Sequence, residues 1–254
     1  MSRDRVTRLS LKSARVCVAG IGGTGSAVAT GLVAAGVGRV HMVDFDHVEE
    51  SNLTRQLLFT EHDIGRLKVD VAVERLRAIN SLIDISGENR RITGPEDIVA
   101  LMNDCDIYVL CADSPVKKMP YWTNTGALRT RTLWYMAVYE GPTVTITALA
   151  PGVTGCWACL RHERDAAEFV AEGRPLMGWP PSAVVSATAN VAGQMCALEI
   201  VAQLSGMPTQ VLGRTYRHNL ACWDNRYYLD IPHFDDCSEC GNVSVEHRRS
   251  ERKG

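Results

Sequence analysis

The sequence predicts an α/β fold in which antiparallel strands extend a mostly parallel sheet. Short apolar, β-prone runs alternate with segments of helical character, a pattern typical of parallel strands joined by right-handed crossovers. The alternating β-branched residues at 143–150 then predict the start of an antiparallel part. The predicted strands are residues 16–19, 40–43, 83–88, 107–111 and 131–139, and the predicted helices are residues 26–35, 65–80, 95–102 and 186–204.

A glycine-rich turn follows the first predicted strand. Gly20, Gly22 and Gly25 have the spacing G-x-G-x-x-G, and a helix of small residues comes next. In this spacing the first glycine permits a tight turn, the second lets the backbone approach a phosphate, and the third lets the helix pack on the strand. The N-terminus of the helix attracts an anion. The turn therefore predicts a Rossmann-like nucleotide site.

Asp44 stands at the end of the second predicted strand. An acidic residue about 20 positions beyond such glycines typically binds the ribose hydroxyls of an adenine nucleotide. NAD, FAD and ATP all satisfy these two features equally, so this part of the motif leaves a redox enzyme and a nucleotide-dependent transferase both open.

The residues that follow Asp44 favour ATP. Arg55 and Lys68 can reach back over the glycine turn, and Asn52 adds a neutral donor. Such cations are needed when a carboxylate attacks the α-phosphorus, because negative charge then shifts onto the leaving pyrophosphate. Asp113 ends another apolar run and is a natural ligand for Mg²⁺. Taken singly, Arg55 is equally a solvated surface residue and Asp113 equally a helix cap; their joint occurrence favours ATP.

Four segments together resemble the ThiF/MoeB/HesA family, the bacterial relatives of ubiquitin-activating enzymes. They read GIGGTGS, VDFDHVEESNLTRQ, DIGRLK and CADS. The resemblance implies ATP-dependent adenylation of a carboxylate, usually the C-terminal glycine of a small ubiquitin-like sulfur carrier protein, by a homodimer. It assigns Asp44 to the ribose, Arg55 and Lys68 to the phosphates, and Asp113 to Mg²⁺. The predicted nucleotide-binding set is Gly20, Gly22, Gly23, Gly25, Asp44, Asp46, Asn52, Arg55, Gln56, Lys68 and Asp113, of which Arg55, Lys68 and Asp113 are the predicted catalytic residues.

Two C-x-x-C pairs predict a metal site. Cys156 and Cys159 form the first pair, and Cys237 and Cys240 form the second. One such pair also occurs in redox proteins, but two pairs can offer four thiolates to Zn²⁺ in a closed, structural site. The resemblance agrees with this interpretation. The metal is expected to fasten the C-terminal tail to the core.

The chain departs from the family pattern in three places. Only Arg3, Arg5 and Arg8 precede the first strand, where the family has a helix with an arginine that reaches the partner's ATP site, and Ser114 replaces the usual asparagine. Residues 160–182, where some members carry a reactive cysteine, contain none. Cys196 in an apolar helix and Cys222 in a late β-like segment are weak candidates for a nucleophile. We therefore expect adenylation without an obligatory enzyme thioester.

The bulk properties narrow the class of protein. The 254 residues are divided into a nucleotide-binding part (1–150), a zinc-bearing part that binds the substrate tail (151–245) and a disordered basic tail (246–254). A net charge of −2 argues against nucleic-acid binding, and no apolar stretch is long enough for a membrane span. Nine cysteines, four of them assigned to zinc, favour a cytoplasmic protein.

The leading hypothesis is thus an adenylyltransferase that activates the C-terminus of a ubiquitin-like carrier. One alternative is adenylation of a peptide or small-molecule carboxylate in a specialised biosynthetic pathway. Another is a catalytically reduced subunit that presents a peptide to a separate enzyme. An NAD-dependent redox enzyme is disfavoured, because it would leave Arg55 and Lys68 unexplained.

Overall fold

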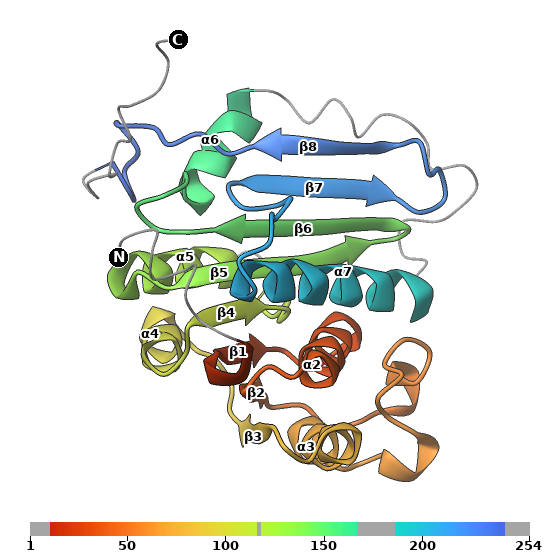
Figure 1. Cartoon of the computed structure of the whole chain (residues 1–254). Coiled ribbons are helices and arrows are strands. Elements are labelled where there is room, and N and C mark those ends of the chain that lie inside the picture. The colour runs from red at the N-terminus through yellow and green to blue at the C-terminus, as the bar shows by residue number, and fades with distance from the viewer. Residues whose placement is uncertain (1–10, 116–117, 167–185, 242–254) are drawn as a thin grey trace.

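One continuous sheet organises the computed structural model, which describes residues 11–115, 118–166 and 186–241 (Figure 1). The eight described strands follow the order β3-β2-β1-β4-β5-β6-β7-β8. The first five in sequence pair in parallel and the last three are added antiparallel. The strands are β1 (Arg15–Ala19), β2 (Arg39–Asp44), β3 (Asp84–Asn89), β4 (Ile107–Leu110), β5 (Leu133–Glu140), β6 (Thr143–Leu149), β7 (Arg214–Asn219) and β8 (Arg226–Asp230).

Helices cover both faces of this sheet, as its parallel strands require. One core lies between the sheet and the helices α2, α3 and α7, and a second core lies between the opposite face and α4, α5 and α6 (Figure 1). The helices are α2 (Gly23–Ala35), α3 (Lys68–Ile79), α4 (Pro95–Asn103), α5 (Met119–Thr130), α6 (Trp157–Ala166) and α7 (Ser186–Leu204), with short 3₁₀ turns η1 (Leu11–Ser13), η2 (Glu50–Asn52) and η3 (Glu61–Asp63).

The predicted α/β class and the change to antiparallel strands after β5 are confirmed. Several predicted element bounds were wrong; helix α2, for example, begins at Gly23 rather than at residue 26. The helix predicted from residue 65 begins at Lys68, because Gly65 has a φ of 86° and residues 61–63 form a separate 3₁₀ turn. The strand predicted from residue 131 begins at Leu133, since Arg131 closes the unpredicted helix α5 in a left-handed conformation. Cys222 lies in the turn between β7 and β8 rather than in a strand.

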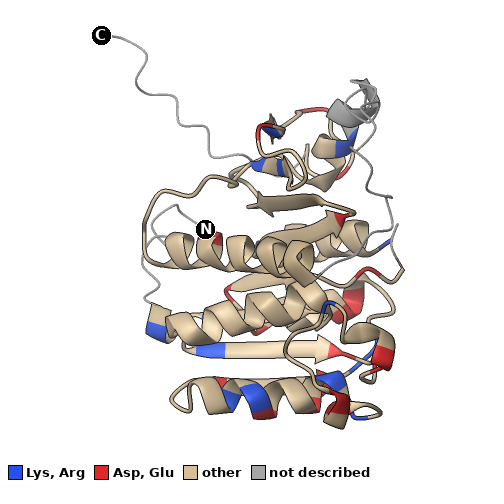
Figure 2. Cartoon of the chain, turned by 90° about the vertical axis from the view of Figure 1, so that its right-hand side faces the viewer, with Lys and Arg blue, Asp and Glu red and all other residues tan. Residues whose placement is uncertain are grey.

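The topology brings distant segments together at one edge of the sheet. Parallel strands end at the same edge, so the glycine turn after β1, the end of β2 and the end of β4 become neighbours. Figure 2 views the molecule from the right-hand side of Figure 1, where α2 carries no charged residue while α3 below it carries both signs. Ligands of open α/β sheets typically bind at this edge.

Among the described residues, no helix is both long enough and apolar enough for a membrane-crossing segment.

Candidate active site

The glycine turn between β1 and α2 is held by contacts that only glycine allows. Gly20 has a φ of 89°, and a Cβ there would overlap the backbone of Ala112 at the end of β4. A Cβ on Gly25 would collide with the carbonyl group of Gly20. Gly22, the N-cap of α2, provides no side-chain hydrogen bond to the first turn of the helix. The backbone N–H groups of that turn are therefore left to bind an anion.

A cavity of about 630 Å³ opens in front of this turn. Its walls come from the ends of β1, β2 and β4, the segment between β2 and α3, and the far half of β5. Of the eleven residues predicted to bind the nucleotide, all but Gly25 line the cavity: Gly20, Gly22, Gly23, Asp44, Asp46, Asn52, Arg55, Gln56, Lys68 and Asp113. Gly25 lies inside α2, where it permits the tight turn rather than contacting the cavity.

Asp44 is fixed at the end of β2 by two backbone donors. The N–H of Ile21 donates to Oδ2 at 2.6 Å and the N–H of Asp46 donates to Oδ1 at 2.8 Å. Burial raises the pKa of the Asp44 carboxyl group above its ordinary value, and the two N–H groups partly oppose the shift. The side chain is 9% exposed and cannot turn away from the cavity without losing both bonds. The Asp44 carboxylate is thus held rigidly where it can accept hydrogen bonds from ribose hydroxyl groups.

Lys68 is the first residue of α3 and is 5% exposed. Its Nζ lies 3.2 Å from Oδ2 of Asp46, whose side chain is about half exposed. A buried ammonium group beside one solvated carboxylate keeps much of its field for a second anion. Lys68 is therefore suited to bind phosphate.

Arg55 reaches the cavity from the loop after η2. Its Nη1 donates to the carbonyl oxygen of Ser51 at 3.0 Å. Throughout the described chain, no carboxylate forms an ion pair with this guanidinium group. The full positive charge of Arg55 is consequently available to a ligand.

Two neutral polar residues complete this wall. Asn52 is buried, and its Oδ1 accepts the N–H of Glu49 at 3.2 Å, which shapes the 3₁₀ turn before Arg55. Gln56 is 3% exposed, and its Oε1 has no hydrogen-bond partner within the described residues. A buried polar atom without a partner is costly unless a ligand or water satisfies it. The Oε1 atom of Gln56 thus marks a position at which a bound molecule would supply the missing hydrogen bond.

Asp113 follows β4 and stands exposed at the rim, between the glycine turn and β5. Its carboxylate is the donor type that Mg²⁺ prefers when phosphate oxygens supply other ligands. Cys111, two residues earlier, also lines the cavity, but burial raises the pKa of its thiol to about 12. This thiol is therefore protonated at neutral pH and is a poor nucleophile.

Several cavity residues escaped the sequence analysis. Arg90 and Ile92 follow β3, Met119 begins α5, and Tyr139 lies near the end of β5. None belongs to a short motif, and each reaches the cavity only because the strand order β3-β2-β1-β4-β5 brings its element to the same edge of the sheet as the glycine turn. Phe45 was passed over although it lies next to Asp44; it packs under Arg91, whose guanidinium carbon is 3.5 Å from the ring centroid.

The four predicted zinc ligands come together at the start of α6. The sulfur atoms of Cys156, Cys159, Cys237 and Cys240 all lie within 4.8 Å of one another. The Cys156–Cys237 and Cys159–Cys240 pairs are 3.8 and 3.5 Å apart. Tetrahedral Zn–S bonds of about 2.3 Å would place sulfurs about 3.8 Å apart. The donor set and its spacing therefore fit a tetrahedral thiolate metal site that joins residues 237–240 to the core.

The thiols of this cluster affect one another's protonation. A hydrogen bond from Cys156 lowers the pKa of the Cys159 thiol, while the same bond raises the pKa of Cys156. A bound cation would replace these shared protons and ionise the thiols. The cluster is thus chemically suited to bind a cation through four thiolates.

The other candidate cysteines lie apart from the cavity. Cys196 is fully buried in α7, and burial raises the pKa of its thiol well above the ordinary value. Cys222 is exposed in the β7–β8 turn and does not line the cavity. The described residues do not include Arg3, Arg5 and Arg8, residues 167–182, or the basic tail at 246–254.

Comparison with known proteins agrees with this geometry. The sequence model of the ThiF family matches residues 4–240. The sulfur carrier protein ThiS adenylyltransferase of Escherichia coli (strain K12) is 32% identical over 200 residues, covering 78% of this chain and 75% of that protein. Protein HesA of Leptolyngbya boryana is 28% identical over 242 residues, covering 94% and 81%.

Among solved structures, the crystal structure of E. coli MccB with ATP is similar at a TM-score of 0.79 and 28% identity. The similarity covers 91% of this chain and 67% of MccB. The match of the family model spans the glycine turn, the charged cavity and all four clustered cysteines. This chain is a member of the ThiF family.

Proposed function

We propose that this protein is an ATP-dependent adenylyltransferase that activates a carboxylate as an acyl-adenylate, with a small ubiquitin-like sulfur carrier protein as substrate. One observation carries the proposal: the uncapped N-terminus of α2, the fixed carboxylate of Asp44 and the cations Arg55 and Lys68 all face one cavity. The N-terminus of α2 attracts phosphate, and Asp44 accepts hydrogen bonds from the ribose hydroxyl groups. Arg55 and Lys68 stabilise the negative charge of a triphosphate. The adenylyltransferases among its relatives support the same function.

In the proposed reaction, an oxygen of the substrate carboxylate attacks the α-phosphorus of ATP. A new P–O bond forms while the bond from the α-phosphorus to the bridging oxygen breaks, and that electron pair leaves with pyrophosphate. No proton has to be removed, because the carboxylate is already ionised at neutral pH. The protein therefore contributes orientation and electrostatic stabilisation rather than a general base.

Each side chain has a separate part in this scheme. Asp44 holds the ribose and so sets the position of the α-phosphorus. Lys68 and Arg55 stabilise the charge that develops on the pyrophosphate. Asp113 would hold Mg²⁺, which when bound neutralises phosphate charge.

We assign the thiolate cluster to Zn²⁺ with a structural role. Four protein ligands leave no open coordination position for a substrate. We further propose that residues 1–150 bind the nucleotide while residues 151–245 carry the metal and receive the substrate tail. A homodimer in the cytoplasm completes the proposal; the dimer is the arrangement expected of the family, and nine unoxidised cysteines fit a reducing compartment.

A peptide substrate is the second candidate, and one finding favours it. The similar solved structures include MccB with AMPCPP and MccA, and MccB described as a microcin C7 biosynthetic enzyme in complex with N-formylated MccA. A peptide C-terminus and a carrier C-terminus present the same carboxylate. The chemistry at the cavity would be identical, and only the surface that receives the rest of the substrate would differ.

ATP–pyrophosphate exchange tests the function and separates the two substrates. The purified protein is assayed with a panel of ubiquitin-like carriers and biosynthetic peptides, each with a free or an amidated C-terminus. We expect exchange with one class of substrate, abolished by amidation. Exchange with peptides alone would replace the carrier by the second candidate. Binding of ATP without exchange for any substrate would contradict adenylation by this chain alone.

A further inference from the structure

Two helices fix the backbone of Arg55, which lies in the loop after η2. Asn190 of α7 donates from Nδ2 to the carbonyl oxygen of Arg55 at 3.3 Å. Gly23, the first residue of α2, packs so closely that a Cβ there would lie 3.2 Å from the same carbonyl oxygen and 3.5 Å from Cγ of Arg55. The loop that carries Arg55 is therefore held against both α7 and the helix whose N-terminus faces the cavity.

The amide group of Asn190 is itself oriented by the first turn of α7. Its Nδ2 also donates to the carbonyl oxygen of Ser186 at 2.8 Å and to Oγ of the same residue at 3.2 Å. These contacts lie within one helical turn, so they favour a single orientation of the side chain. The bond to Arg55 then joins this turn of α7 to the loop that carries the guanidinium group.

Close packing makes the start of α7 a firm support for that bond. Helix α7 lies against α2 on one face of the sheet (Figure 1). A Cβ on Gly193 would collide with Cβ of Ala27, so the two helices meet without a gap. One turn beyond Asn190, Gln194 donates from Nε2 to the carbonyl oxygen of Ala27 at 3.0 Å. Because closely packed interiors yield little, Asn190 has a fixed position relative to the N-terminus of α2.

The way in which the loop is held decides where the charge of Arg55 lies. Nη1 of Arg55 donates to the carbonyl oxygen of Ser51 at 3.0 Å, but Ser51 is only four residues away and moves with the same loop. Within the described parts of the chain, no carboxylate pairs with this guanidinium group. A misplacement of about 1 Å can cost on the order of 100-fold in rate when a group must meet a reacting centre. An anchor from outside the loop therefore bears on function.

We propose that Asn190 is a positioning residue, whose amide group holds the loop that carries Arg55 against the N-terminus of α2, so that the guanidinium group meets the phosphates of ATP. The inference rests on the proposed function of the cavity and adds to it a residue of α7. Asn190 does not itself line the cavity. Its contribution should therefore act through Arg55, disappear when the Arg55 side chain is absent, and depend on the phosphates rather than on the nucleoside.

A double-mutant cycle on the full-length protein tests this directly. Calorimetry gives the affinity for Mg·ATP of the wild type, Asn190→Leu, Arg55→Ala and the double variant. Leucine has nearly the shape of asparagine but cannot donate a hydrogen bond, and we expect Asn190→Leu to weaken binding about fivefold, the scale of one neutral hydrogen bond. In the Arg55→Ala background the same change should alter affinity by less than about twofold.

Gln194 provides a matched control on the same helix. Gln194→Met keeps an unbranched side chain and, like Asn190→Leu, removes an amide that donates to a backbone carbonyl group, here that of Ala27 rather than that of Arg55. If Asn190 acts through Arg55 and not through the packing of α7 on α2, the affinity of Gln194→Met for Mg·ATP should stay within about twofold of the wild type.

Two further measurements exclude a merely structural effect. The affinity of Asn190→Leu for adenosine, which lacks phosphates, should equal that of the wild type. Asn190→Ala removes the same amide without adding an apolar branch, and it should weaken Mg·ATP binding as Asn190→Leu does. Thermal unfolding checks that the variants remain folded.

The outcomes separate this inference from the function on which it rests. Unchanged Mg·ATP affinity in Asn190→Leu and Asn190→Ala would overturn the positioning role while leaving the nucleotide site intact. An equal loss in Gln194→Met, or in the Arg55→Ala background, would also overturn it, because Asn190 would then act without Arg55. A wild-type protein that fails to bind Mg·ATP would overturn the proposed function itself, and this inference with it.

Discussion

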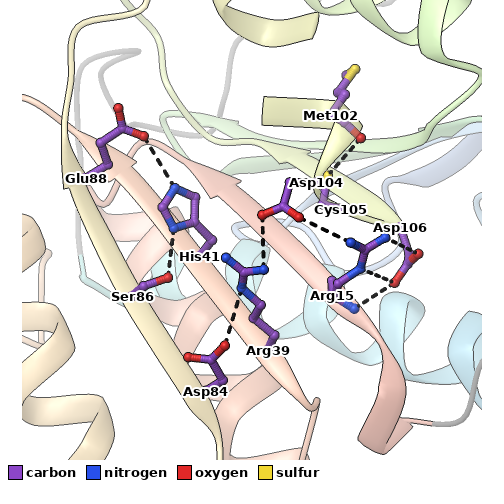
Figure 3. A network of polar contacts seen from close by, with 10 residues as sticks. All are labelled: Arg15, Arg39, His41, Asp84, Ser86, Glu88, Met102, Asp104, Cys105 and Asp106. Carbon is purple, nitrogen blue, oxygen red and sulfur yellow. Dashed lines mark hydrogen bonds and ion pairs between the residues drawn. The ribbon is translucent and has the colours of Figure 1, made fainter. Parts of the chain in front are cut away.

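The two ends of the parallel strands carry similar charged residues but use them in opposite ways. At the amino end, Arg15 pairs with Asp104 at 3.2 Å and Asp106 at 3.3 Å. Arg39 beside it pairs with Asp84 at 3.4 Å and Asp104 at 3.0 Å (Figure 3). Each guanidinium group at this end therefore has two carboxylate partners within the chain.

At the carboxyl end, Arg55 and Lys68 are less neutralised within the chain. Arg55 has no carboxylate partner among the described residues, and Lys68 has one that is about half exposed. Asp44 there accepts hydrogen bonds from backbone groups rather than from a cation. The charges at this end are fixed in place but remain available to a ligand.

The comparison shows that a hollow is not sufficient to identify a site. The amino end also has one, of about 270 Å³, beside Arg15, Arg39 and His41. His41 also has partners within the chain: its Nδ1 lies 2.9 Å from Oγ of Ser86, and its Nε2 lies 3.6 Å from Oε2 of Glu88 (Figure 3). What distinguishes the carboxyl end is the combination of a larger cavity, an uncapped helix N-terminus and cations whose charge is not cancelled.

Two glycines offer the largest contrast between the ends. A Cβ on Gly25 would strike the carbonyl group of Gly20 beneath the site, whereas a Cβ on Gly36, the C-cap of α2 at the amino end, meets nothing within 4 Å. We expect Gly25→Ala to destabilise the fold by about 3 kcal/mol and to abolish ATP binding. Gly36→Ala should cost only about 1 kcal/mol of left-handed backbone strain. Urea unfolding measures both; equal costs would mean that the glycine turn is not closely packed.

Removing one arginine from each end tests which charges serve catalysis. We expect Arg55→Ala to reduce ATP–pyrophosphate exchange on the order of 100-fold, the scale for losing one electrostatic contact to a transition state. Arg15→Ala should leave exchange within about twofold of the wild type. If Arg15→Ala impairs exchange as strongly in a protein that remains folded, the contrast between the ends does not hold.

Metal removal asks whether the site depends on the distant thiolate cluster. Chelation, or Cys240→Ser, should lower the free energy of unfolding by on the order of 2 kcal/mol or more, because the metal joins residues 237–240 to the core. The affinity for Mg·ATP should be unchanged while the protein is folded. Zinc released per chain is measured beside thermal unfolding; release without any loss of stability would contradict a structural metal.

The smallest predicted effect is on acid stability and concerns the ion pair of Arg90 with Asp97. Arg90 borders both hollows. Its partner Asp97 accepts the N–H of Thr93 at 2.8 Å, and this bond together with Arg90 lowers the pKa of the Asp97 carboxyl group to about 2. The folded pKa lies below the unfolded value, so this stabilisation is complete above about pH 4 and is lost as the pH falls towards 2.

Asp97→Asn should therefore reduce the loss of stability between pH 5 and pH 3 relative to the wild type. Urea unfolding of both proteins at the two pH values measures the difference. Parallel losses would show that Asp97 does not contribute to acid sensitivity.

Local sequence patterns were enough to predict the first six strands of the sheet and much of the cavity. The glycine spacing and the strand-end position of Asp44 are properties of one continuous segment, and they predicted contacts within that segment. The two C-x-x-C pairs were also recognisable, because each pair fixes two ligands on one short turn. Arg55 and Lys68 could be related to the turn through their place between the second strand and the following helix.

Residues that reach the cavity through tertiary structure could not be predicted in this way. Tyr139 lines the same cavity as Arg55 only because β5 pairs with β4. Asn190 reaches the backbone of Arg55 only because α7 packs on α2. Helix α5 was missed because its sequence, MPYWTNTGALRT, lacks a clear apolar stripe. Neither a strand order nor a helix–helix contact is encoded in a short motif.

Equilibrium binding of Mg·ATP is the most direct test of the difference between the two ends. The wild type is compared with Lys68→Ala at the carboxyl end and Arg39→Ala at the amino end. We predict that the wild type binds, that Lys68→Ala weakens binding about 50-fold or more, and that Arg39→Ala binds like the wild type. Unaltered affinity in Lys68→Ala, or a comparable loss in Arg39→Ala, would contradict the assignment of the carboxyl end as the nucleotide site.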